Sequence, residues 1–107
     1  MLLKWEQVAD AIAQALQGAT AAMRRWVSSP SYKSAIAALV QARHQSGKTQ
    51  REVAAAIGKP PSFVAKVETG ERRLDFVEFI VLARALGQDP AILLGDIAEQ
   101  LGGRVDI

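Results

Sequence analysis

Cysteine is absent from the 107-residue chain. This excludes disulfides and thiolate metal sites, and we expect the protein in a reducing cytoplasm. Aromatic residues make up only 6% of a sequence that is half apolar, and alanine supplies much of that half, which favours close-packed helices over a sheet. No apolar run approaches the roughly 18 residues of a membrane span. Glu6 and Asp10 interrupt the stretch that a secretory signal would need.

Groups that usually support catalysis are also scarce. His44 is the only histidine, and with no second histidine or cysteine beside it we expect no metal site, no catalytic dyad and no cofactor. Two carboxylate pairs at helical spacing, Glu68 with Glu71 and Asp96 with Glu99, are explained as solvent-facing or capping groups. The sequence therefore does not predict an enzyme.

Charge is present but unevenly distributed. Residues 30–74 carry eight Lys or Arg against three acidic residues, a balance of +5, whereas residues 75–107 have a balance of −4. A basic segment with an acidic far side is typical of a protein that binds a polyanion on one face. Arg43 and Arg51 lie in the basic segment, and we interpret them as surface residues or weak phosphate contacts.

Helical periodicity and helix-end signals divide most of the chain into helices. Thr49 with Glu52, and Asp75 with Glu78, have the spacing of capping boxes. Ser29 precedes Pro30 as a cap precedes a first helical residue. The predicted helices are approximately 31–45, 49–57, 61–68, 75–86 and 90–101.

An additional N-terminal helix is predicted over 3–27. Its apolar residues recur at alternating spacings of four and three, and these are Trp5, Ala9, Ile12, Leu16, Ala19, Met23 and Trp26. This stripe can pack on its own domain or pair with a second subunit, or the first 22 residues can be an upstream extension. We accordingly divide the chain into a helical extension (1–29), a main domain (30–101) and a flexible tail (102–107).

Two short helices joined by a tight glycine turn form a helix-turn-helix pattern in the middle of the chain. Ala54 is small where the two helices must cross, and Gly58 supplies the turn. Four apolar residues are predicted to point into a shared core: Val53, Ile57, Val64 and Val67.

The segment IGKPPSFVAK, residues 57–66, determines where the second of these helices begins. Each proline disfavours helical geometry in the residue before it, so the helix is expected to begin at Pro61. We expect the N–H groups of Ser62 and Phe63 to be free at the positive end of the helix dipole, where a phosphate can bind.

The stretch QREVAAAIGKPPSFVAKVET, residues 50–69, resembles the helix-turn-helix of the phage-repressor/Cro-like (XRE) family of bacterial regulators. The resemblance extends over about residues 32–95 and includes Gln50, Ala54, Gly58 and the Arg72–Arg73 turn. It implies an all-α fold, a five-helix DNA-binding domain whose third helix, about 61–68, lies in the major groove; phage repressors are the standard example of that geometry.

The resemblance also implies DNA-contacting residues. Gln50 occupies the position of an amide that grips a phosphate and braces the recognition helix, and Ser62 and Lys66 occupy positions that reach base edges. Pro61 departs from the family, where this position often carries a glutamine that reads adenine. Phe63 can touch a thymine methyl or shield the helix packing. The turns would supply phosphate contacts from Lys59, Arg72 and Arg73.

These features predict a sequence-specific transcriptional regulator, with repression as the default, acting as a homodimer on an inverted-repeat operator. No small-molecule effector is expected. One alternative is the antitoxin of a toxin–antitoxin pair, which would use the same DNA-binding domain and bind a toxin protein through an apolar face. Another is a protein-binding adaptor that does not bind DNA.

Overall fold

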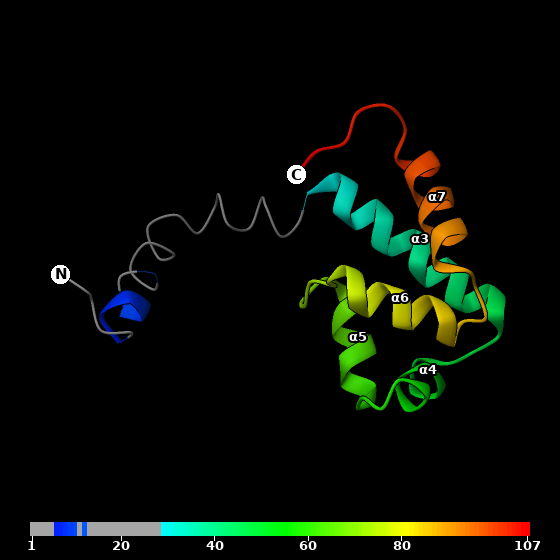
Figure 1. Cartoon of the computed structure of the whole chain (residues 1–107), viewed down its shortest axis with the longest axis horizontal. Helices are drawn as coiled ribbons and strands as arrows, with labels where there is room; N and C mark the ends of the chain where they lie inside the picture. Colours follow the sequence, from blue (N-terminus) through cyan, green and yellow to red (C-terminus); the bar gives the residue numbers. More distant parts are fainter. Residues whose placement is uncertain (1–5, 11, 13–28) are drawn as a thin grey trace.

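The computed structural model describes residues 6–10, 12 and 29–107. Residues 6–10 and 12 are helical, and the predicted helix over 3–27 otherwise lies outside the described residues. The described part contains helices and no strand (Figure 1). After the N-terminal segment the helices are α3 (Pro30–Ser46), α4 (Gln50–Ala56), α5 (Pro61–Thr69), α6 (Phe76–Ala85) and α7 (Pro90–Leu101).

Polar side chains fix the beginnings of four of these helices. The Ser29 hydroxyl accepts a hydrogen bond from the Tyr32 N–H at 3.1 Å, and Pro30 occupies the first turn of α3. Asp89 caps α7 in the same way. Both predicted capping boxes are present, Thr49 with Glu52 at α4 and Asp75 with Glu78 at α6. Each cap satisfies backbone N–H groups that would otherwise lack a partner.

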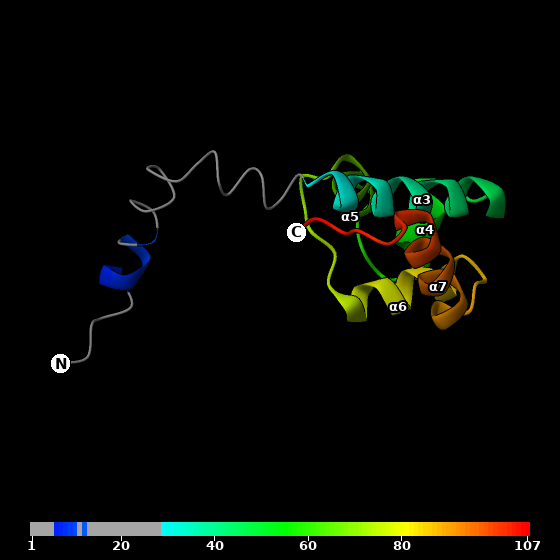
Figure 2. The same cartoon turned by 90° about the horizontal axis from the view of Figure 1, so that it is seen from above.

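The helices pack around one small core. α3 lies against α7, α4 against α5, and α6 contacts both α4 and α7, an arrangement that is visible in two perpendicular views (Figures 1 and 2). Ala54 and Ala83 are completely buried where these helices meet, which confirms the expectation that position 54 needs a small residue. Among the four residues predicted to share the core, Val53, Val64 and Val67 are almost fully buried, and Ile57 packs against the cluster from its edge.

The last residues of the chain return to the beginning of the domain. The Asp106 N–H donates to the Ser31 hydroxyl at 2.8 Å, and the C-terminus lies beside the start of α3 (Figure 1). This contact joins positions that are 75 residues apart in the sequence. The division of the chain into an extension, a domain and a flexible tail stays a prediction.

Candidate nucleic-acid interface

Helix α5 has one face in the core and one face in solvent. Val64 and Val67 are only 2% and 1% exposed, whereas Pro61, Ser62 and Lys66 are exposed. A helix with this division presents its polar side chains at a fixed angle, because the buried face leaves it no rotational freedom. Ser62 and Lys66 thus lie together on the outer face, as the sequence predicted.

The two prolines begin α5 where the sequence indicated. Pro60 is extended, with φ −68° and ψ 154°, and Pro61 is the first helical residue. Gly58 has a φ of +71°, a left-handed conformation that favours glycine. The expectation that the Phe63 N–H is free was wrong, because it donates to the Pro60 carbonyl at 2.9 Å. This bond closes a tight first turn that needs no capping side chain.

Two cationic side chains lie near the Phe63 ring, one from the turn before α5 and one from the turn after it. The Lys59 ammonium lies 5.6 Å from the ring centroid and the Arg72 guanidinium carbon 4.6 Å from it. Both distances are within the range of cation–π attraction. The half-buried Phe63 therefore contacts two side chains for which the family resemblance implies phosphate contacts.

Arg72 is also paired with a carboxylate. Its guanidinium donates to both oxygens of Glu78 at 2.9 and 2.7 Å, and its side chain keeps 41% of its surface exposed. The bond from Arg72 lowers the pKa of Glu78, and the backbone N–H of Asp75 acts in the same direction. The same pair raises the pKa of Arg72. Glu78 was predicted only as a helix cap, and its second role was missed because the pairing depends on the turn between α5 and α6.

Arg73 lies against α3. Its guanidinium carbon is 4.3 Å from the centroid of the Tyr32 ring. The Tyr32 hydroxyl in turn accepts a hydrogen bond from the Leu74 N–H at 3.1 Å. Tyr32 thus holds the turn after α5 against the first helix of the domain.

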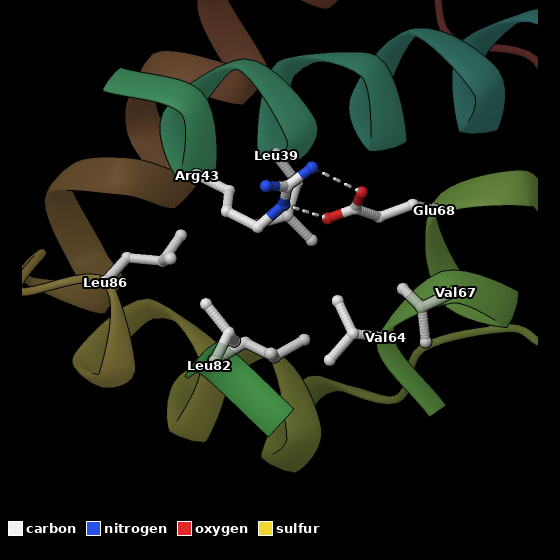
Figure 3. Close-up of a pocket in the computed structure, with 8 residues that line it drawn as sticks. Leu39, Arg43, Val64, Val67, Glu68, Leu82 and Leu86 are labelled. Atoms are coloured by element: carbon white, nitrogen blue, oxygen red, sulfur yellow. Dashed lines mark hydrogen bonds and ion pairs between the residues drawn. The ribbon is translucent and has the colours of Figure 1, made fainter. Parts of the chain in front are cut away.

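Glu68 fastens the other end of α5 to two helices. The Arg43 Nε donates to Glu68 Oε2 at 2.7 Å and Nη2 to Oε1 at 3.0 Å, and the Gln50 amide donates to Oε1 at 2.8 Å. Figure 3 shows Arg43 and Glu68 facing each other beside the apolar side chains of the core. Gln50 is therefore placed to brace α5 through Glu68.

Arg43 and Glu68 correct two interpretations from the sequence. Arg43 is no surface or phosphate-contacting residue, since its side chain is only 13% exposed and its Nη1 also donates to the Lys48 carbonyl at 2.9 Å. Glu68 is neither solvent-facing nor a cap, with 10% of its side chain exposed. The two residues are 25 positions apart, so no local pattern could reveal the pair.

The candidate residues thus form three groups around one helix. Lys59, Phe63 and Arg72 cluster at its beginning, Ser62 and Lys66 lie on its exposed face, and Gln50 lies at its far end. Pro61 fixes the start of the helix, and Arg73 belongs to the turn that follows. Within the described residues, no helix is long and apolar enough to cross a membrane.

Comparison with known proteins agrees with this geometry. A family model for helix-turn-helix domains matches residues 39–93. Among solved structures, the chain is similar to an XRE-family-like protein from Pseudomonas syringae pv. tomato str. DC3000, with 40% sequence identity and a TM-score of 0.63 over 76% of this chain and 94% of that one. No curated protein matches the chain. The family match spans half of the chain, and it contains the glycine turn, α5 and the residues that brace α5. The chain therefore belongs to the XRE family of helix-turn-helix proteins, which are DNA-binding transcription regulators.

Proposed function

We propose that the protein is a repressor that binds an inverted-repeat operator as a homodimer, with α5 as the recognition helix. The observation that carries the proposal is the presentation of α5. One face is locked into the core by Val64 and Val67, and the opposite face exposes Ser62 and Lys66. A rigidly held helix with short and basic outer side chains fits the major groove, which admits an α-helix.

The residues around α5 have separate roles in this proposal. Ser62 and Lys66 reach base edges and supply discrimination between sequences. Lys59 and Arg73 contact phosphates in the turns that flank the groove, and Gln50 donates its remaining amide hydrogen to a phosphate while bracing Glu68. These contacts provide affinity that depends on salt but not on sequence.

Phe63 and Arg72 act in this proposal mainly by positioning other side chains at the start of α5. The ring holds Lys59 and Arg72 beside the helix start, and Arg72 already shares its charge with Glu78. Arg72 can still approach a phosphate with the exposed part of its guanidinium. Pro61 has no group that can read a base, so its contribution is the fixed start of α5.

Repression follows from occupancy. A dimer places two recognition helices in successive major grooves about 34 Å apart, and the occupied site then excludes other proteins. Acidic residues of α7, Asp96 and Glu99, would lie away from the DNA and limit non-specific binding, because α7 packs against α3 and α6. Membership of a DNA-binding family does not support an adaptor that lacks DNA affinity.

A selection of random DNA sequences with the purified full-length protein tests this proposal. We expect an enriched motif with two-fold symmetry. The logarithm of the binding constant should fall linearly with the logarithm of salt concentration. An operator cloned over a reporter promoter should then lower expression when the protein is present. Failure to enrich any motif would refute sequence-specific regulation, and increased reporter expression would refute repression.

A further inference from the structure

A hollow of about 250 Å³ lies where the beginning of α3 meets the end of α5. Four residues of α3 line it, and these are Tyr32, Lys33, Ile36 and Ala37. The last turn of α5 and the glycine that ends this helix complete the lining. The hollow therefore joins the candidate recognition helix to a helix that has so far been given no contact with DNA.

Lys33 carries the one unpaired charge among the residues that line this hollow. The Glu68 carboxylate, the only acidic group in the lining, is already compensated by its three hydrogen-bond donors. The Thr69 hydroxyl donates to a backbone carbonyl within α5 at 3.2 Å, so it is engaged as well. Lys33 is exposed, and its ammonium makes no hydrogen bond or ion pair with any described residue.

A single cation beside apolar side chains indicates the chemistry of the ligand. Ile36 and Ala37 offer apolar surface, and the Lys33 ammonium can only donate, so it requires an acceptor, best an anionic one. A deoxyribose with its phosphate combines both parts. The guanidinium carbon of Arg73, 4.3 Å from the centroid of the Tyr32 ring, places a second cation beside the same hollow.

The position of the hollow favours the DNA backbone as the source of this phosphate. The N-terminal residues of a recognition helix contact base edges, so the other end of α5 lies toward the backbone that borders the groove. At a rise of about 1.5 Å per residue, the ends of the nine-residue α5 are roughly 12 Å apart, which is about the width of the major groove. Lys59 before α5 and Lys33 beside its end must therefore contact different phosphates.

We propose that Lys33 binds a phosphate of the operator backbone at the end of α5, with the adjoining deoxyribose in the hollow against Ile36 and Ala37. This contact comes from α3, outside the helix-turn-helix and before the residues 39–93 that the family model matches. The inference rests on the proposed function, because it takes α5 as the helix in the major groove. It extends the proposed phosphate contact of Arg73 onto the first helix of the domain.

Fluorescence anisotropy of the full-length protein with the selected operator tests the phosphate contact. Lys33→Gln should lower the slope of the logarithm of the binding constant against the logarithm of salt concentration by about 0.9 for each half-site. Lowering the salt from about 1 M to about 0.1 M should then strengthen its binding about eightfold less per half-site than that of the wild type. Lys33→Arg retains the charge and should retain the slope. Circular dichroism should show that both variants are folded.

Operators in which single phosphates are replaced by neutral methylphosphonates locate the contact. At one phosphate of each half-site, the replacement should weaken binding of the wild type about eightfold but weaken binding of Lys33→Gln less than about twofold, because the contact is already absent. Lys59→Ala should lose its sensitivity at a different phosphate.

A side chain that fills the hollow tests whether the deoxyribose enters it. Ala37→Leu should raise the dissociation constant of the operator complex at least about fivefold, because the added atoms occupy the space of the sugar. Gln41→Leu places the same side chain at an exposed position of α3 outside the hollow, and it should change the dissociation constant by less than about twofold.

An unchanged salt slope in Lys33→Gln would overturn the inference. Equal loss of sensitivity at every phosphate would overturn it as well, since that is a general effect of net charge, and so would wild-type affinity in Ala37→Leu. Each of these results can be obtained with an operator that the wild type binds specifically, so they are distinct from failure of the operator selection. A selection that enriches no motif, together with a lowered salt slope of Lys33→Gln on random duplex DNA, would refute the proposed function alone.

Discussion

Glu68 shows how one side chain can set the angle of a recognition helix. With only 10% of its side chain exposed, its carboxylate is compensated by two donors from Arg43 and one from Gln50. Removing one member of such a pair leaves a charge that is neither hydrated nor matched, which is more costly than losing a surface ion pair. Arg43, Gln50 and Glu68 together therefore hold α3, α4 and α5 in one geometry.

For this reason Arg43→Ala should lower the free energy of unfolding by about 3 kcal/mol, as expected for breaking a largely buried ion pair. Urea denaturation followed by circular dichroism measures the change. Arg51→Ala removes an exposed arginine from α4 and should alter the same quantity by no more than about 0.5 kcal/mol. Equal effects of the two substitutions would contradict the role assigned to the pair.

Substitution of individual basic residues should separate discrimination between DNA sequences from affinity that does not depend on sequence. Lys66→Ala should weaken binding to the preferred operator by about 1–3 kcal/mol and relax preference at one base position. Lys59→Ala should weaken binding to all sequences alike and lower the salt slope by about 1 per site. Fluorescence anisotropy at several salt concentrations distinguishes the two lysine variants. Arg104→Ala removes the same charge from an exposed position in the tail and serves as the control. The division of roles fails if both lysine variants change specificity in the same way.

At the scale of helices and turns, the glycine between α4 and α5 is a sensitive point. Gly58→Ala should cost about 1–2 kcal/mol, because the residue has a φ of +71° although a Cβ there would meet no other atom. Gly95 lies in the interior of α7, also with space for a Cβ, and Gly95→Ala should stabilise the fold by about 0.5–1 kcal/mol. Thermal and urea unfolding should therefore shift in opposite directions. A shift of the same sign would show that backbone conformation does not decide the outcome.

The Arg72–Glu78 pair joins the turn after α5 to the start of α6, and its contribution to the free energy of unfolding should depend on pH. The pKa of Glu78 is lowered in the folded state, first by Arg72 and then by the Asp75 N–H. The stabilisation is therefore complete above the unfolded pKa of about 4.3 and is lost as the pH falls through the lower folded value. Glu78→Gln retains a residue suited to the capping box but cannot ionise. Urea titrations between pH 6 and pH 3 should show a smaller loss of stability in this variant, and an equal loss would contradict the assignment.

Helix boundaries were predictable because their causes are local. Thr49 and Asp75 each find their capping partner three residues later, and the two prolines fix the start of α5 within the segment that contains them. Contacts between distant segments were not predictable. The approach of Arg43 to Glu68 requires the helices to be packed first, and the approach of Arg72 to Phe63 requires the turn after α5 to fold back on that helix.

At the scale of the whole molecule, the packing of the helices determines where the recognition helix lies. The proposed DNA contacts lie around α5, and α5 is held by its packing against α3 and α4. In the proposed homodimer, two such rigid domains fix the separation and relative rotation of the two recognition helices. The protein should therefore bind both half-sites of an operator only when they are separated by one particular distance.

Inserting five base pairs at the centre of the selected operator should abolish binding of the dimer to both half-sites, because the second half-site rotates by about half a helical turn. Inserting ten base pairs restores the rotational phase but lengthens the separation by about 34 Å, and a rigid dimer should not span it either. Footprinting of both operators shows whether one or two half-sites are protected. Protection of both half-sites after either insertion would show that the DNA-binding domains of the two copies are flexibly joined.

The aromatic ring of Phe63 has a further consequence, for the thermodynamics of binding. Long cationic side chains usually lose rotamer freedom when they contact DNA, at a cost of about 0.5–1.5 kcal/mol each. Lys59 and Arg72 are already held over the ring in the free protein, so much of this entropy is lost during folding instead. Calorimetry should accordingly find that replacing Phe63 with leucine makes the entropy of operator binding less favourable, although no charge and no base contact has been removed.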